Sequence, residues 1–335
     1  MLIIKALHGL HLSGKNWATK FGAIMKEEGW EISKADPKAW MKRNGDHYEY
    51  VGSYVDDLIV AATDPQAFFD CLREKYKLRL KGDAPLRYHL GCNFGRDPDG
   101  TLYQSAKQYV ERMHDNYTRL FKSSPRSCTT PLEPNDHPEL DLSPELDEDG
   151  IARYQSLIGS LQWAVSLGRL DITTAVMTMS GFRANPREGH LERVRRIVGF
   201  LLKFKHAALR YRTACPDYSQ LSPQRHDWDA TPYGDVHEEI PDDAPPALGN
   251  PVITTTWVDA NLYHDFLTGR AVTGIVHAVN QTVLDFCSKK QNTVETSTYG
   301  SEFVAARTAT DQIIDLRLTL RYLACGQECS SGNPE

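Results

Sequence analysis

The chain has 335 residues, of which 41% are hydrophobic, and its formal net charge is -6. This length and composition are typical of a globular protein with two or three domains, and they exclude a largely disordered chain. No apolar run approaches the roughly 18 residues that a membrane span requires, and the apolar start is too short for a secretory signal. We therefore expect an intracellular protein that is not secreted.

The predicted elements of the first third alternate between helices and short strands. Residues 10–30 have the apolar spacing of a helix, and residues 40–42 and 47–54 have that of strands. Asn44 and Gly45 form a strong hairpin signal between those strands. A helix is predicted from Pro65 to residue 76, followed by a strand, a DPDG turn, a second strand at 101–104 and a helix over 105–120.

The remaining two thirds are predicted to be helical first and then rich in strands. Three helices are expected at 154–167, 172–183 and 190–204. Strands at 252–258, 271–278 and 282–286 and a long helix over 298–323 follow.

Charge is unevenly distributed along the chain. Residues 133–149 contain eight acidic residues with no Lys or Arg, and residues 217–243 are similarly acidic, so both stretches are predicted to be linkers. In contrast, residues 187–212 contain eight basic residues against two acidic ones. This basic stretch is compatible either with a phosphate-binding surface or with an ordinary solvated helix face, and the pattern alone favours neither.

The seven cysteines stand at positions 71, 92, 128, 215, 287, 325 and 329. They show no paired metal-binding spacing, so reduced structural thiols are expected. Any metal ion would have to be held by carboxylates.

The adjacent carboxylates Asp56 and Asp57 lie between two apolar runs in the stretch SYVDDLIVAA, at a predicted strand-to-strand turn. Two neighbouring acids repel each other when both are charged, and a divalent cation relieves this repulsion. A solvated turn is the alternative interpretation of such a short motif.

A series of longer motifs gives these acids a context. The motifs are, in chain order, ALHGLHLSGKNW (6–17), YVDDLIVAA (54–62), LRYHLGCNFGRDPDGTLYQSAKQYVERM (86–113), TTPL (129–132), YQSLIGSLQWAVSLGRLDI (154–172), TTTWVDANLYHD (254–265), TGRAVTG (268–274) and CSKKQNTVETSTYGSEFVAART (287–308). Together they resemble the reverse transcriptase and ribonuclease H region of copia-type LTR retrotransposon polyproteins, truncated at both ends.

The resemblance implies a polymerase site at the YVDD box. It makes Asp56, with Asp57 beside it, a catalytic residue and a ligand of Mg²⁺ or Mn²⁺. The family's polymerases use a further palm aspartate on a strand ahead of the first helix, and two metal ions act together in such sites. That strand is not expected in this sequence, so we expect an incomplete site.

The resemblance implies a second metal site in the ribonuclease H part. Its expected catalytic and metal-binding residues are Asp259, at the end of a strand, and Glu302, in the first turns of the long helix. The family completes this site with acids on later elements, which are not expected within this sequence, so we expect an incomplete site here as well. Asp311 and Asp315 fall outside the family's pattern and are predicted to be surface or packing residues.

The predicted fold class is α+β, with a partial reverse transcriptase palm and thumb, a helical connection and a partial ribonuclease H-like domain. The predicted ranges are 1–121 for the palm and thumb-like part, 122–150 for an acidic linker, 151–212 for the helical connection, 213–251 for a second linker and 252–335 for the ribonuclease H-like part.

The resemblance implies RNA-directed DNA synthesis and hydrolysis of RNA in RNA–DNA hybrids, and we expect this chain to be inactive by itself. The implied partners are an RNA template, a DNA primer, an RNA–DNA hybrid and the remaining polyprotein segments, in a cytoplasmic particle or the nucleus, with no membrane. The alternative is a non-catalytic nucleic-acid-binding remnant. Its candidate contacts are Arg193, Arg195, Arg196, Lys203, Lys205, Lys289 and Lys290.

Overall fold

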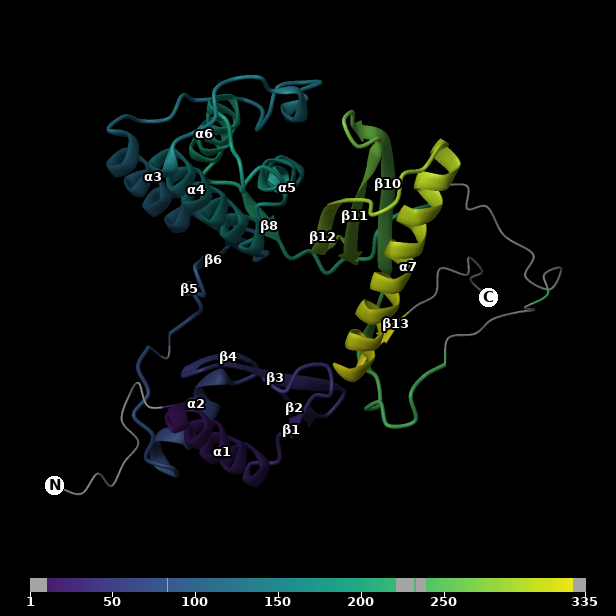
Figure 1. Ribbon diagram of the computed structural model, residues 1–335. Coiled ribbons are helices and arrows are strands. Elements are labelled where there is room, and N and C mark those ends of the chain that lie inside the picture. The colour runs from purple at the N-terminus through teal and green to yellow at the C-terminus, as the bar shows by residue number, and fades with distance from the viewer. Residues whose placement is uncertain (1–10, 83, 221–231, 233–238, 328–335) are drawn as a thin grey trace. The chain divides into compact units, whose positions relative to one another are not determined.

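The computed structural model describes residues 11–82, 84–220, 232 and 239–327 (Figure 1). The chain divides into two compact units, one of residues 1–85, 217–253 and 314–335 and the other of residues 86–216 and 254–313. Both units combine helices with β-sheets, and this mixture confirms the predicted α+β class.

The first unit contains a four-stranded antiparallel sheet. Its strands, in spatial order, are β1 (Glu31–Ile32), β2 (Ala39–Asn44), β3 (His47–Tyr54) and β4 (Asp57–Ala61). Asn44 pairs with His47, so the two-residue turn consists of Gly45 and Asp46, one position later than predicted. Gly45 adopts a φ of +65°, which glycine reaches without a steric penalty.

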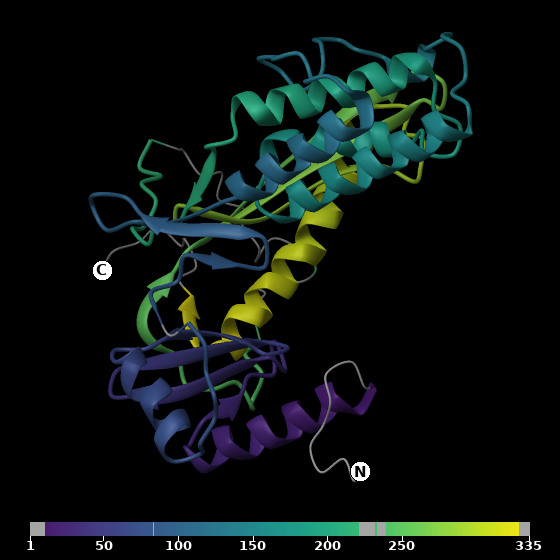
Figure 2. The same cartoon turned by 90° about the vertical axis from the view of Figure 1, so that its left-hand side faces the viewer.

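Two helices, α1 (His11–Glu27) and α2 (Pro65–Glu74), pack on one face of this sheet, and Figure 2 shows α1 in dark purple along it. Phe21 and Met25 of α1 meet Trp40 and Val51 of the strands in a buried core. The start of α2 is fixed by the side chain of Asp64, which accepts a hydrogen bond of 3.0 Å from the backbone N–H of Ala67.

A short parallel pair of strands completes the described part of the first unit. Strand β9 (Leu248–Val252) pairs with β13 (Cys325–Gln327). The hydroxyl of Tyr50 donates a 2.7 Å hydrogen bond to the carbonyl of Leu323, just before β13. The sequence patterns predicted neither this contact nor strand β13.

The second unit begins with another antiparallel sheet. Its order is β5 (Tyr88–His89), β6 (Cys92–Arg96), β7 (Leu102–Ser105) and β8 (Ala208–Arg210). Strand β8 comes from about a hundred residues further along the chain and pairs with β7. One face of the sheet packs against a helical layer.

The helical layer has one continuous core. It consists of α3 (Lys107–Phe121), α4 (Glu148–Ser166), the short helix η2 (Leu170–Ile172), α5 (Thr173–Ser180) and α6 (Glu188–Lys203). Val110, Tyr154, Ile158, Ile197 and Leu201 are fully buried in it. Residues 86–121 therefore pack with the helices of residues 148–203, whereas the predicted range for the palm and thumb-like part was 1–121.

A three-stranded antiparallel meander follows in the second unit, formed by β10 (Thr254–Asp265), β11 (Arg270–Val279) and β12 (Thr282–Lys290). The long helix α7 (Thr298–Tyr322) contacts one face of it: Gln312 Oε1 lies 3.1 Å from His277 Nε2. Residues of α5 pack against strand β12 of this sheet. These elements match the strands and helix predicted after residue 250, except that β10 continues to Asp265, so Asp259 lies within the strand and not at its end as predicted.

The acidic connection between α3 and α4 is ordered along α6. It contains the short helix η1 (Pro138–Leu140), and the carbonyl of Pro138 lies 2.8 Å from the Nε2 of buried His190 on α6. The second acidic stretch falls partly on residues 221–231 and 233–238, which lie outside the described residues. The six cysteines of the described chain are free thiols, as predicted, and Cys329 is not described.

Candidate functional site

The YVDD box forms the tip of the β3–β4 hairpin. Tyr54 pairs with Asp57, so Val55 and Asp56 are the two central residues of the turn. Val55 has a φ of +56°, and the residue is 62% exposed. This conformation is unfavourable for a β-branched residue, and it persists only where the surrounding structure imposes it.

Helix α1 supports the turn from outside the hairpin. The indole Nε1 of Trp17 donates a 2.6 Å hydrogen bond to the carbonyl of Val55. Trp17 also stacks on Phe21, which is buried against the sheet. The tip of the hairpin is therefore connected to the helix–sheet core. The hydrogen bond from Trp17 helps to hold Val55 in its unfavourable backbone conformation.

The hairpin presents both predicted carboxylates at its exposed end. Asp56 lies in the turn and Asp57 is the first residue of β4, and both are exposed. Side chains alternate between the two faces of a strand, and Val60 packs toward the helix-covered face. Asp57, three residues before Val60, is therefore on the opposite face of the sheet from α1 and α2.

These carboxylates fit a divalent-metal centre only in part. Oxygen ligands of this kind suit Mg²⁺ and Mn²⁺. Two-metal phosphoryl transfer needs carboxylates that clamp both ions. Within the described residues there is no group of three or more His, Cys, Asp and Glu side chains that could hold a metal ion. The hairpin therefore supplies two donors and not a complete centre.

The predicted pair Asp259 and Glu302 lies on β10 and α7 of the second unit. Asp259 is opposite Gly274, which is opposite Ser288, so these three residues share one face of the meander. Helix α7 lies on the other face, because its Gln312 contacts His277, whose partner across the strands is Thr256. Asp259 is three residues from Thr256 and so faces away from α7.

Asp259 instead lines a hollow of about 290 Å³ together with Leu170 and Thr173, beside η2 and α5. Glu302 is half-buried on α7. The structure thus does not bring the two acids together on one face of the sheet, and their metal-binding role stays a prediction.

Most of the predicted nucleic-acid contacts are engaged in ion pairs within the protein. Five of the seven basic residues have carboxylate partners: Arg193 with Asp136 and Asp141, Arg195 with Glu192, Arg196 with Glu133, Lys205 with Glu111, and Lys290 with Asp265. Lys203 lies over the ring of Phe204, and Lys289 is exposed. The partners of Arg193 and Arg196 come from the acidic connection that lies along α6.

Arg193 pairs with two carboxylates that are both largely buried. Its guanidinium donates to both carboxylate oxygens of Asp136 at 2.8 Å and to Asp141 at 2.6 Å. Burial would raise the pKa of Asp141, but hydrogen bonds from Ser143 and Arg193 outweigh burial and lower the pKa to about 2. The acidic connection is therefore held by charge-assisted hydrogen bonds.

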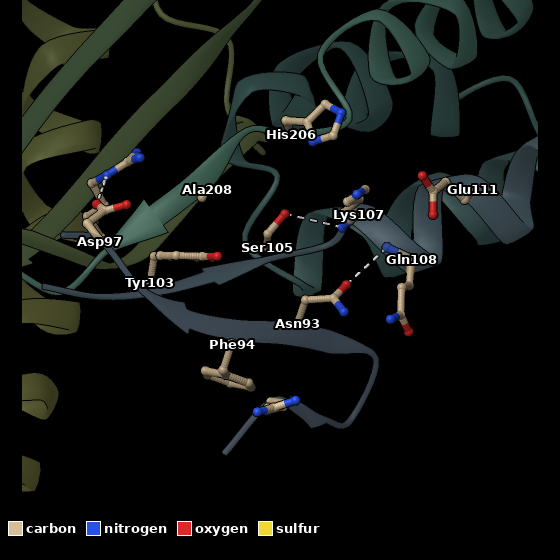
Figure 3. A pocket seen from close by; sticks show the side chains of 12 residues that line it. Asn93, Phe94, Asp97, Tyr103, Ser105, Lys107, Gln108, Glu111, His206 and Ala208 are labelled. Atoms are coloured by element: carbon tan, nitrogen blue, oxygen red, sulfur yellow. Dashed lines mark hydrogen bonds and ion pairs between the residues drawn. The ribbon is translucent and has the colours of Figure 1, made fainter. Parts of the chain in front are cut away.

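The structure reveals a polar pocket that the sequence patterns did not indicate. It has a volume of about 520 Å³ and lies on the β6–β7–β8 sheet beside the start of α3 (Figure 3). Tyr103, Lys107 and His206 are among its lining residues. They come from separate parts of the chain, so no local sequence pattern marks this face.

Comparison with known proteins shows relatives among transposon proteins. The chain is 27% identical over 212 residues to the putative transposon Ty5-1 protein of Saccharomyces cerevisiae, covering 62% of this chain and 66% of that protein. It is 29% identical over 198 residues to the retrovirus-related Pol polyprotein from transposon RE1 of Arabidopsis thaliana, covering 59% of this chain and 13% of the polyprotein.

The similarity to the retrovirus-related Pol polyprotein from transposon TNT 1-94 of Nicotiana tabacum extends over 331 residues at 24% identity, which is 97% of this chain and 22% of the polyprotein. The chain thus spans less than two thirds of the length of each of these three relatives. No family model and no solved structure matches it. In the described part of the chain, no helix is both long and apolar enough to cross a membrane.

Proposed function

Because the chain is homologous to part of the Pol polyproteins of Ty/copia-type retrotransposons, we propose that it derives from their reverse transcriptase and ribonuclease H region. The intact region would copy RNA into DNA and degrade the RNA strand of the hybrid. In the RE1 and TNT 1-94 polyproteins, the region homologous to this chain is accompanied by further polyprotein segments.

The observation that carries this proposal is the geometry of the YVDD hairpin. A strained turn at Val55 projects Asp56 and Asp57 from a sheet whose other face is covered by α1 and α2. Strained backbone conformations are concentrated at functional sites, where the surrounding structure holds them. Among the non-glycine residues of the described chain that have a positive φ, Val55 is the one with a β-branched side chain.

The order of elements in the last part of the chain also supports the proposal. Three antiparallel strands, β10 to β12, lead into the long helix α7, as the resemblance to a ribonuclease H-like domain implies. Asp259 lies on the first of these strands and Glu302 near the start of the helix, at the positions that the resemblance assigns to metal ligands.

We propose further that this chain does not catalyse either reaction by itself. Each reaction depends on Mg²⁺ or Mn²⁺ held by several converging carboxylates. Asp56 and Asp57 lie side by side at one hairpin tip, and Asp259 faces away from the helix that carries Glu302. The two acids of each site are therefore insufficient for a two-metal mechanism.

We predict that the purified chain does not cleave the RNA strand of a fluorescently labelled RNA–DNA hybrid in Mg²⁺ or Mn²⁺. Glu302→Gln should leave this null result unchanged, and so should Asp311→Asn, a change of the same kind at an exposed position further along α7. Cleavage by the wild-type chain that is lost in Glu302→Gln and kept in Asp311→Asn would contradict the proposal and assign an active nuclease site.

A non-catalytic nucleic-acid-binding protein is the second candidate function. The ion pairs of Arg193, Arg195 and Arg196 leave little unpaired positive charge on α6. Arg87 and Lys107, which line the polar pocket on the β6–β7–β8 sheet, form no ion pair with a carboxylate of the described residues, and this observation supports the second candidate at that pocket.

A further inference from the structure

The hollow beside η2 and α5 lies on the face of the meander that is turned away from α7. Asp259 is opposite Gly274, and Trp257, two residues earlier on β10, is opposite Val276, so these four residues share that face. All four line the hollow. Helix α5 contacts β12, the strand of this sheet that is farthest from β10 (Figure 1). The hollow therefore extends from β10 across the sheet to α5.

Gly274 leaves space in the middle of the hollow. A Cβ atom placed on this glycine would meet no atom within 4 Å. Gly274 is not among the glycines of the described chain that have a positive φ, so its backbone conformation does not require glycine. The space over β11 is therefore due to the missing side chain, and a larger residue at this position would fill it.

The walls of the hollow are mostly apolar. Trp257, Val276 and Phe286 line it from the strands, and Leu170 lines it from η2. Trp257 is 51% exposed and Leu170 is 38% exposed, so an apolar ligand would remove part of both side chains from water. The volume of about 290 Å³ is at the lower end of the range of small-ligand sites, which suits a ligand with a single ring.

Two polar groups without partners lie at different sides of the hollow. On β10, the carboxylate of Asp259 forms no ion pair and no hydrogen bond with the described residues. On α5, Thr173 is only 9% exposed, and its hydroxyl oxygen has no hydrogen-bond partner in the described part of the chain. A buried polar group without a partner costs free energy, which a hydrogen bond to a ligand would recover.

The positions of these groups determine the polarity of a ligand. Asp259 attracts a positive charge, and the ring of Trp257 beside it also favours a cation. Thr173 is the first residue of α5, where the positive end of the helix dipole disfavours a cation and favours an electronegative atom. The ligand should therefore have a positive charge at one end and a neutral hydrogen-bonding group at the other.

From this arrangement we propose that the hollow binds a small aromatic amine, with its ammonium group beside Asp259, its ring against the apolar walls and a hydroxyl group at its far end hydrogen-bonded to Thr173. A single carboxylate among apolar walls suits a singly charged organic cation better than Mg²⁺, which requires several oxygen ligands. This inference goes beyond the proposed function and does not rest on polymerase or nuclease activity.

The test is a titration of the full chain with tyramine, followed by saturation-transfer difference NMR in a buffer that contains EDTA. Tyramine has an ammonium group, one ring and a phenolic hydroxyl. Phenethylamine lacks the hydroxyl, and tyrosol has a neutral hydroxyl in place of the ammonium group. Tyramine should bind most tightly, and each of the other two compounds should bind about three- to fivefold more weakly, the loss expected for one hydrogen bond or one exposed ion pair.

The role of the charge is tested with Asp259→Asn, which should weaken tyramine binding about three- to fivefold and leave tyrosol binding unchanged. Asp285→Asn is the matched control. Asp285 is an exposed residue of β12 that does not line the hollow, so this variant should bind tyramine like the wild type.

The role of the hydroxyl is tested with Thr173→Val, which removes the hydroxyl and keeps the shape of the side chain. This variant should bind tyramine and phenethylamine equally, because the hydrogen bond that distinguishes them is gone. Its melting temperature should not fall, since the hydroxyl has no partner within the described residues. A purely structural role of Thr173 would leave the ratio of the two affinities unchanged.

The location of the site is tested with Gly274→Val, which should fill the hollow and weaken tyramine binding by about tenfold or more. A β-branched residue is favoured in a strand, so this variant should fold. Gly52→Val is the matched control, because Gly52 also lies in a strand and a Cβ atom there also meets no atom within 4 Å. Thermal melting verifies that each variant is folded.

Three results would each overturn the proposal: no saturation transfer from the folded wild-type chain to tyramine, equal affinity for tyrosol and tyramine, or unchanged tyramine binding by folded Gly274→Val. Glu302→Gln should bind tyramine like the wild type, because Glu302 does not line the hollow. Since the titration is carried out in EDTA and without nucleic acid, its failure is distinguishable from a failure of the proposed function.

Discussion

Replacement of Arg193 by alanine should destabilise the protein by about 3–5 kcal/mol, because it leaves two largely buried carboxylates without their partner. The side chains of Asp136 and Asp141 are only 13% and 10% exposed, and Arg193 hydrogen-bonds to both. Denaturant unfolding followed by circular dichroism measures the loss. Arg196→Ala is the matched control on the same helix. Its partner Glu133 is 63% exposed, so that change should cost about 1 kcal/mol or less.

The same ion pairs give stability a defined pH dependence. The pKa of Asp141 is lowered from 3.8 to about 2 in the folded protein, so its contribution is present above pH 3.8 and is lost as the pH falls toward 2. The free energy of unfolding of the wild type should therefore decline over this interval. Arg193→Ala should show a shallower decline, and an equally steep one would contradict the assigned ion pairs.

Gly199→Ala should be the second strongly destabilising change, by about 1–3 kcal/mol, which is the usual cost of overpacking. A Cβ atom at Gly199 would lie 1.9 Å from the carbonyl oxygen of Arg126, so α6 and the connection after α3 would have to separate. Thermal unfolding measures the effect.

Gly159→Ala provides the control for this change. Gly159 is exposed within α4, and no atom lies within 4 Å of a Cβ placed there. Alanine is favoured over glycine inside a helix, so Gly159→Ala should stabilise the protein by about 0.5–1 kcal/mol. Equal effects of the two changes would show that the connection does not pack against α6 as described.

Elements with strong local signals were predicted closely. The hairpin strands β2 and β3, helix α2 with Pro65 at its start, and the meander followed by α7 have clear apolar periods and turn residues. Strands β8 and β13 were missed because each has three residues and pairs with a partner far away in the sequence. Short segments of this kind have no detectable period.

The candidate sites were predicted less completely than the fold. The YVDD turn was located correctly because it depends on adjacent residues. The ion pairs of Arg193 with Asp136 and Asp141 could not be predicted, since these two residues are more than fifty positions away in the sequence. The register of β10 decides on which face of the sheet the Asp259 side chain lies, and a shift of one residue would place it on the face that α7 contacts. The polar pocket on the β6–β7–β8 sheet depends on β8, which the sequence did not predict.

The most direct test of the proposed function is addition of a single labelled nucleotide to a DNA primer annealed to an RNA template by the purified full chain, in Mg²⁺ and in Mn²⁺, with Asp56→Asn measured beside it. We predict that neither protein extends the primer, because the YVDD hairpin supplies two carboxylates and not a complete metal centre. Extension by the wild-type chain that disappears in Asp56→Asn would contradict this account and establish a working polymerase site at the hairpin.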